Sequence, residues 1–147
     1  MTPPRIDKAS IQAKLRLLVE LVEDFDAVGD VDQTRLQDER LTRRAVERIL
    51  TQAVDVAVSV TSHVAGQVLP LLSTTYRGSF DDAATVGLIT AELAASMGAA
   101  AGMRNLLVHE YVRVDLALVA AAVPRAGPTS SSSSVRSADG WSSTADR

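Results

Sequence analysis

The stretch from Thr34 to Gly66, TRLQDERLTRRAVERILTQAVDVAVSVTSHVAG, decides the fold class of this sequence. Its apolar residues recur at steps of three and four, the spacing that lines one face of an α-helix. The repeating positions are Leu41, Ala45, Ile49, Ala53, Val56, Val60 and Val64. Charged residues lie between them, and a glycine stands where the pattern stops. We therefore predict one helix of roughly 30 residues, which would be about 45 Å long.

A helix is also expected before this stretch. It would begin after Pro3 and Pro4 and end at Gly29, because proline favours the start of a helix and glycine its end. The apolar positions with helical spacing are Ile11, Leu15, Leu18, Val19, Val22 and Phe25.

Two further helices are expected after the stretch. Residues 67–80 contain Pro70 and a Ser-Thr-Thr cluster, so they are predicted to form a connection. Ser79, followed closely by two aspartates, would cap a third helix that runs to about Met97. Two glycines then interrupt an Ala-rich segment, and a fourth helix is expected over residues 104–123.

The composition supports an all-α fold. The chain has 147 residues, of which 46% are hydrophobic but only 3% aromatic, so aliphatic and alanine side chains must fill the core. This favours a bundle of four to five helices over a sheet sandwich. The length fits one domain, which we place at residues 1–123. The absence of cysteine excludes disulfides, a thiolate nucleophile and a Cys-ligated metal.

Residues 124–147 are expected to be a disordered tail. They include five consecutive serines, Ser130–Ser134, followed by a mixture of serine, aspartate and glycine. A segment of this composition cannot bury enough apolar surface to offset the entropy of ordering it.

The charge of the chain limits the kinds of partner it can bind. The net charge of −3 and the pI near 5.3 argue against a broad basic surface for nucleic acid, although a local basic site is still allowed. The N-terminus is charged where a secretory signal needs an apolar core, and no apolar run approaches the roughly 20 residues of a membrane span. We therefore expect a cytoplasmic protein without membrane contact.

The segment RNLLVHEYVRVD, which begins at Arg104, places polar side chains among apolar ones. On a continuous helix, Arg104, Tyr111 and Asp115 fall within about 20° of one direction, and Asn105 and His109 share a neighbouring stripe. Leucines and valines flank this direction on both sides, so the polar stripe runs through the packing face. Buried charges are costly unless they are paired, so the stripe requires an explanation.

Two explanations of this stripe are open. It can be a satisfied network, such as an ion pair between Arg104 and Asp115 with Tyr111 as a hydrogen-bond partner, that holds helices or subunits in register. Alternatively, the same residues form an active site. The helical wheel alone favours the network, because structural networks also place charges inside a protein.

The segment resembles the Arg-x-x-x-x-His motif of the HEPN superfamily, in the extended Arg-x-x-x-x-His-x-Tyr form of its HepT-like toxin branch. Arg104, His109 and Tyr111 match this motif position by position. Neighbouring residues that also look like that branch are Gly102, Met103, Asn105, Val108, Val112, Arg113, Val114 and Asp115. Weaker similarities extend the resemblance over roughly residues 5–120.

The resemblance implies a homodimeric helical bundle in which the motifs of two subunits face one cleft and act as a metal-independent endoribonuclease. It assigns RNA cleavage to Arg104 and His109. It also implies a toxin–antitoxin system, of type II or type VII, in which a minimal nucleotidyltransferase antitoxin silences the toxin by attaching AMP to Tyr111. No metal or cofactor is implied, and a larger hetero-oligomer with the antitoxin stays open.

The side chains fit this chemistry. RNA supplies its own nucleophile, the 2′-OH, so cleavage needs proton transfer and neutralisation of the phosphorane. The imidazole of His109 can transfer protons near neutral pH, and the guanidinium of Arg104 offers a planar fork of donors to phosphate. Asn105 would orient the His109 ring or contact the substrate, with Asp115 in a supporting role. AMP on Tyr111 would add bulk and negative charge beside Arg104.

Three residues outside the motif are expected to have structural roles. His63 is expected to be a packing or capping residue, because a chain with only two histidines offers little for a metal site. Tyr76 and Arg77 are expected to anchor the loop before the third helix.

A cluster of charges on the long helix has a similar interpretation. Glu47 with Arg43, Arg44 and Arg48 would form a solvated face with helical charge pairs. The alternative is that one of these arginines lines the path of the RNA.

The main rival function is a non-catalytic module. In that case the chain would be a helical dimer that binds a nucleotidyltransferase partner, and the polar stripe would only specify docking. The acidic net charge favours this rival over an RNA-binding enzyme.

Overall fold

A computed structural model describes residues 6–109 and 115–122 of the chain. Its helices are α1 (Lys8–Val28), α2 (Gln33–Asp38), α3 (Arg40–Ala65), α4 (Tyr76–Thr85) and α5 (Ala91–His109). Residues 116–122 are also helical. The described ranges contain no strand, so the expected all-α fold is confirmed. The predicted tail, residues 124–147, lies outside the described residues.

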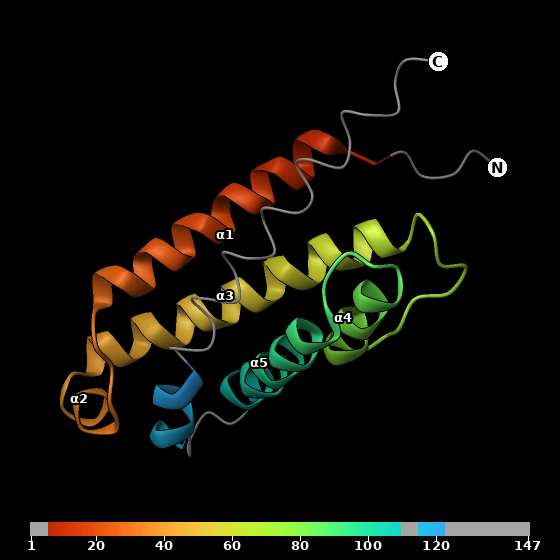
Figure 1. The fold of residues 1–147 in the computed structure, drawn as a ribbon. Helices are drawn as coiled ribbons and strands as arrows, with labels where there is room; N and C mark the ends of the chain where they lie inside the picture. The colour runs from red at the N-terminus through yellow and green to blue at the C-terminus, as the bar shows by residue number, and fades with distance from the viewer. Residues whose placement is uncertain (1–5, 110–114, 123–147) are drawn as a thin grey trace.

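Helix α3 is the centre of the fold, because it contacts each of the other four helices. Helix α1 runs beside it on one side, and α4 and α5 pack together on the other (Figure 1). Two apolar clusters fill the interior along α3. One contains Leu21, Phe25, Leu36, Val46, Ile49, Leu50 and Val119. The other contains Val54, Ala57, Phe80, Ala94 and Ala101.

The predicted long helix is wrong in one respect, because the chain breaks at Glu39 into α2 and α3. Glu39 has a φ of −103° and a ψ of 85°, and its N–H donates to the Arg35 carbonyl at 2.8 Å to close α2. The break turns α2 back so that Leu36 becomes fully buried in the core. The Arg35 guanidinium fixes this corner by donating to the carbonyls of Val28 and Asp30, each at 2.7 Å. The burial of Leu36 in the core therefore overrides the continuous helical pattern of the sequence.

Ser79 does not cap a helix, as was predicted, but lies inside α4. The N-cap is Thr75, whose hydroxyl accepts a hydrogen bond from the Gly78 N–H at 3.1 Å. Ser79 is only 4% exposed, and its hydroxyl donates to the Thr75 carbonyl and accepts from the Ser62 hydroxyl of α3, both at 3.1 Å. The serine therefore joins α4 to α3, since its burial leaves no water to satisfy it.

The predicted third helix is divided at Gly87, where α4 ends. Gly87 has a φ of +78°, which favours glycine over residues with a side chain. Its N–H donates to the Ala84 carbonyl at 3.0 Å, and the Leu88 N–H donates to the Ala83 carbonyl at 2.9 Å. These two bonds form a Schellman cap, which ends α4 before the hydroxyl of Thr90 caps the first turn of α5.

Helix α5 runs without interruption past Gly98 and Gly102, so the predicted break before Arg104 is wrong. Gly98 serves close packing, because a Cβ atom there would lie 3.3 Å from the side chain of Arg77 on α4. The alanine-rich sequence and the contact with α4 thus outweigh the cost of two glycines within the helix. As a result, Arg104 lies in the last turns of a helix of 19 residues and not at the start of a new one.

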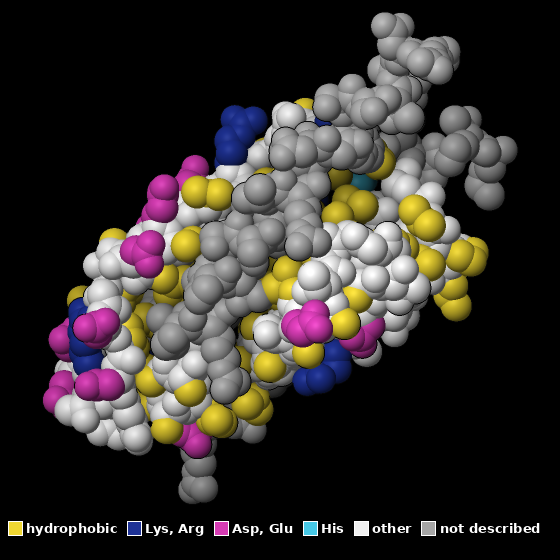
Figure 2. All heavy atoms as spheres, viewed as in Figure 1, with side chains coloured by type: hydrophobic (Ala, Val, Ile, Leu, Met, Phe, Trp, Pro, Cys, Tyr) yellow, Lys and Arg dark blue, Asp and Glu magenta, His cyan; other side chains and the backbone are white. Residues whose placement is uncertain are grey.

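The exposed face of the second half of α1 is acidic. Figure 2 shows acidic side chains along α1 and around α2. On α1 the exposed acids are Glu20, Glu23, Asp24 and Asp26. This face repels the phosphates of a nucleic acid, so a phosphate site is expected elsewhere. In the described residues, no helix combines the length and apolar character that crossing a membrane requires.

Replacing Gly87 or Gly102 by alanine should change the stability of the fold in opposite directions, because the two glycines have different backbone conformations. Gly87→Ala should lower the free energy of unfolding by about 1–2 kcal/mol, because its φ is positive although nothing lies within 4 Å of the added Cβ. Gly102→Ala, in α5 and equally free of neighbours, should raise it by about 1 kcal/mol, because alanine favours a helix. Urea unfolding measures both. Equal effects of the two changes would contradict the assigned cap.

Candidate active site

Three of the predicted site residues, Arg104, Asn105 and His109, lie on the last turns of α5. This end of α5 packs against α3, and α4 lies beside them (Figure 1). Arg104 and His109 are separated by about 7.5 Å of helix rise. His109 is the last residue of α5, and Tyr111 lies outside the described residues.

Arg104 forms an ion pair with an acid of the central helix. Its Nε lies 2.8 Å from Oδ1 of Asp55 on α3, a short charge-assisted hydrogen bond. The Arg104 side chain is 18% exposed and that of Asp55 is 39% exposed. The guanidinium is therefore held at the boundary between the core and the solvent, where it can still meet a ligand.

The same guanidinium lies over an aromatic ring. The central carbon of the Arg104 guanidinium is 4.7 Å from the ring centroid of Tyr76, the first residue of α4, which is within cation–π range. Nη1 of Arg104 also lies 3.4 Å from Oδ1 of Asn105, the next residue on α5. Side chains from three helices thus surround one cation.

The surroundings of Tyr76 raise the pKa of its hydroxyl. Burial raises the pKa of the Tyr76 hydroxyl above its usual value, and hydrogen bonding to Asp55 and the charge of that carboxylate raise it further. The positive charge of Arg104 opposes this increase. Tyr76 therefore stays protonated through the physiological range and can donate to Asp55.

The ion pair of Arg104 with Asp115, one example of the satisfied network considered for the stripe, is not formed, because Arg104 pairs with Asp55 and Asp115 has a local role. Its Oδ1 accepts a hydrogen bond from the Ala117 N–H at 3.0 Å, and its carbonyl accepts from the Val119 N–H at 3.2 Å. Asp115 itself is not helical and caps residues 116–122. The helical wheel assumed one helix through residue 115, so the stripe it drew does not apply to Asp115.

Sequence analysis missed Asp55 and misjudged Tyr76, which contacts Arg104 instead of only anchoring a loop. A signal for Asp55 was present: between Arg48 and His63 it is the only ionisable residue in an otherwise apolar and neutral part of the helix. Its partner could not be identified, because 49 residues separate it from Arg104. Only the packing of α5 on α3 joins them.

The charge pair predicted on the long helix is present. Arg43 and Glu47 form an i,i+4 pair at 3.8 Å on α3, while Arg44 and Arg48 are exposed. His63 has a buried Nε2 without a hydrogen-bond partner in the described part of the chain. Among the described residues, no three His, Cys, Asp or Glu side chains gather closely enough to hold a metal ion.

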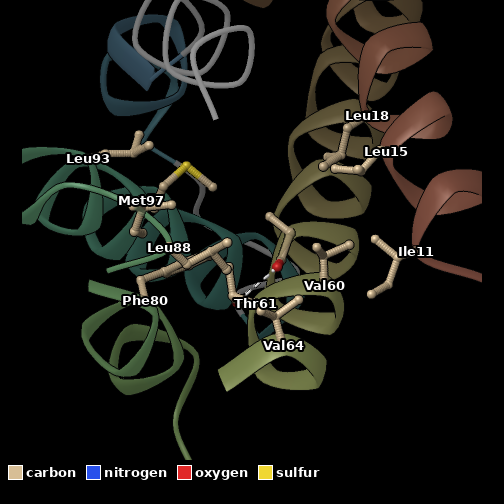
Figure 3. A pocket seen from close by; sticks show the side chains of 12 residues that line it. Ile11, Leu15, Leu18, Val60, Thr61, Val64, Phe80, Leu88, Leu93 and Met97 are labelled. Atoms are coloured by element: carbon tan, nitrogen blue, oxygen red, sulfur yellow. Dashed lines mark hydrogen bonds between the residues drawn. The ribbon is translucent and has the colours of Figure 1, made fainter. Parts of the chain in front are cut away.

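A pocket elsewhere in the fold lacks groups for catalysis. It lies between α1 on one side and α4 with the start of α5 on the other, and α3 forms its floor (Figure 3). The lining is almost wholly aliphatic. Its polar residue, Thr61, already donates its hydroxyl proton to the carbonyl of Ala57 at 3.0 Å. Among its described lining residues, the pocket therefore has no acid, base or cation.

Solved structures share this fold. One is the tri-AMPylated HEPN toxin of Shewanella oneidensis in complex with its MNT antitoxin, with a TM-score of 0.74 and 20% identity over 84% of this chain and 92% of that chain. A second, a toxin–antitoxin crystal structure with AMP-PNP, has the same TM-score, identity and coverage. At this identity the likeness establishes the all-α HEPN fold.

Sequence comparison agrees with the structural one. A tRNA nuclease HepT from Aphanizomenon flos-aquae (strain 2012/KM1/D3) is 25% identical over 113 residues, which is 75% of each chain. The family model described as Ribonuclease HepT-like matches residues 11–130, a range that includes Arg104, His109 and Tyr111. This match covers most of the chain and confirms the family resemblance seen in the motif. The chain therefore belongs to the HepT-like ribonuclease family.

Proposed function

We propose that this chain is an endoribonuclease that cleaves RNA without a metal ion and serves as the toxin of a two-gene toxin–antitoxin pair in the cytoplasm. The observation that carries the proposal is the motif arginine, Arg104, which is held firmly at the solvent boundary by Asp55 and Tyr76. Membership of the HepT-like ribonuclease family supports it. Because the relative from Aphanizomenon is a tRNA nuclease, tRNA is the first substrate to test.

The reaction proposed is internal transesterification of RNA. The 2′-oxygen attacks the adjacent phosphorus, the bond to the 5′-oxygen breaks, and a 2′,3′-cyclic phosphate forms. An imidazole of His109 removes the 2′-OH proton or donates one to the leaving oxygen. Arg104 neutralises the charge that develops on the phosphorane oxygens. Asn105, beside Arg104, contacts the substrate or the arginine, and Asp115 supports the site as a helix cap.

A homodimer would complete the site. Acid and base steps need two proton-transfer groups, and each chain has one motif histidine, so two copies would provide both. Two large apolar side chains near the motif are exposed in the single chain, Leu106 (41%) on α5 and Leu118 (48%) in residues 116–122. Burial of such side chains favours association.

The proposed regulator is a minimal nucleotidyltransferase that attaches AMP to Tyr111. The fold relative from Shewanella oneidensis is a tri-AMPylated toxin in complex with its MNT antitoxin, which supports this assignment. The adenylate would place a negative charge near Arg104 and compete with RNA phosphate. The antitoxin would also hold the toxin in a hetero-oligomer, with the dimer as its minimum unit.

The rival function is a non-catalytic dimeric module that binds the nucleotidyltransferase. The ion pair of Arg104 with Asp55 favours it, because an arginine with an internal partner can have a purely structural role. The acidic face of α1 also favours it. Activity of defined variants separates the two functions.

Removal of either motif side chain should abolish RNA cleavage. In EDTA, His109→Ala should lower the cleavage rate of tRNA by about 10²–10⁴-fold through loss of proton transfer. Arg104→Ala should lower it by about 10²–10³-fold through loss of charge stabilisation. Gel assays of purified protein measure both.

Matched controls exist in the chain. His63→Gln changes the only other histidine, and Arg16→Ala removes an exposed charge from α1; both should cleave RNA at the wild-type rate. If wild type and His109→Ala show the same background rate and the same circular dichroism, the chain is the non-catalytic module.

Co-expression with the partner nucleotidyltransferase should add AMP to Tyr111. Intact-mass and peptide mass spectrometry should find the adduct on wild type and none on Tyr111→Phe. Tyr76, the only other tyrosine, should stay unmodified because its ring is held against the Arg104 guanidinium. An inhibited complex whose Tyr111 carries no adduct would mean that the antitoxin blocks the site sterically.

A further inference from the structure

Two residues outside the motif hold the Arg104 side chain from different helices. Asp55 of α3 binds Nε at 2.8 Å, and the ring of Tyr76 of α4 lies 4.7 Å from the guanidinium carbon. We call Asp55 and Tyr76 the arginine clamp. The pKa of the Tyr76 hydroxyl is raised, first by burial and then by Asp55, so Asp55 acts electrostatically on both Arg104 and Tyr76. The clamp exists only where α3, α4 and α5 pack together.

The clamp leaves part of the guanidinium available. Arginine has five N–H donors in a planar fork. Asp55 takes the Nε donor, and Asn105 lies 3.4 Å from Nη1, which is long for a hydrogen bond. Nη2 has no partner among the described side chains. Because phosphate is bound by donors of this outer edge, the pair with Asp55 at Nε does not compete for them directly.

A role in stability alone fits this ion pair poorly. The Asp55 side chain is 39% exposed, and ion pairs with this access to water contribute little to stability. What the pair does is restrict a long side chain that would otherwise sample many rotamers. The contact with Tyr76 adds to this by holding the guanidinium over the ring.

We propose that Asp55 is a positioning residue, with Tyr76 as its platform, that fixes the outer edge of Arg104 for the scissile phosphate of RNA. This inference rests on the proposed function. If the guanidinium is already in position before RNA binds, no further side-chain entropy is lost when the transition state forms. Asp55 acts only through Arg104. Its negative charge also weakens the binding of RNA in the ground state, so its effects on binding and on catalysis have opposite signs.

These opposite signs define the first experiment. Asp55→Asn should lower the kcat for tRNA cleavage by about 10–100-fold, because Arg104 loses its fixed position, while the KM stays the same or falls. Asp24→Asn removes the same charge from the exposed face of α1 and should leave both constants unchanged. A kcat of Asp55→Asn equal to that of Asp24→Asn would overturn the inference and leave the proposed function intact. A wild type that does not cleave RNA would overturn both.

A double-mutant cycle separates positioning from a structural role. In the Arg104→Ala background, Asp55→Asn should cause no further loss of kcat/KM, because the group through which Asp55 acts is absent. A further loss as large as in the wild-type background would mean that Asp55 acts on the fold, and would overturn the inference. Tyr76→Phe keeps the ring and should retain more activity than Tyr76→Leu, which removes it.

The clamp also has a spectroscopic signature that does not depend on activity. In Tyr111→Phe, Tyr76 is the only tyrosine, so tyrosinate absorbance against pH reports its pKa. This pKa should lie above 10.0, and Asp55→Asn should lower it by removing the hydrogen bond and the charge that raise it. Because the pKa of Tyr76 is higher in the folded state, protonated Tyr76 contributes to stability below pH 10.0. This contribution is lost as the pH rises through the folded-state pKa. An unchanged pKa in Asp55→Asn would contradict the clamp.

Discussion

The ion pair between Arg104 and Asp55 is the contact on which the site depends. At 2.8 Å it joins the last turns of α5 to the middle of α3, and it lies on the ring of Tyr76 at the start of α4. One cation is thus fixed by groups from three helices. A half-exposed ion pair adds little to the stability of the fold. Its main effect is therefore to fix the orientation of the Arg104 side chain.

The packing of α3 makes this contact possible. Its apolar positions pack with α1 and α5 in both apolar clusters, with α2 in the first cluster and with α4 in the second, so each labelled helix is placed relative to it. Asp55 is the one acid in the second half of this helix. The fully buried Val46 and Leu50 and the well-buried Val54 precede it on the same helix, and they fix the position of the carboxylate that Arg104 meets. The core therefore determines the geometry of the site at its edge.

The chemistry of the site is local and electrostatic. The chain is acidic, with a net charge of −3 and acidic side chains along the second half of α1. In the proposed function, RNA would therefore be attracted only where a cation is presented. The apolar pocket between α1 and α4 has no such group. In the proposed function, the RNA phosphate is bound mainly by one residue, Arg104. One adenylate on Tyr111 would therefore be enough to silence the enzyme. A negative charge near Arg104 changes the electrostatic potential at the site.

The sequence by itself determined the all-α class, the family and the two motif residues of α5, because helical periodicity and a short spaced motif are local properties of the chain. It did not determine where helices break. The pattern ran on past Glu39, where the chain turns to bury Leu36, and the glycines of α5 did not end a helix that packs on α4. Nor did it assign Asp55 to Arg104, or Asp115 to its cap. Those pairings join residues through packed helices, and an ion pair forms with whichever charge the tertiary fold brings within reach.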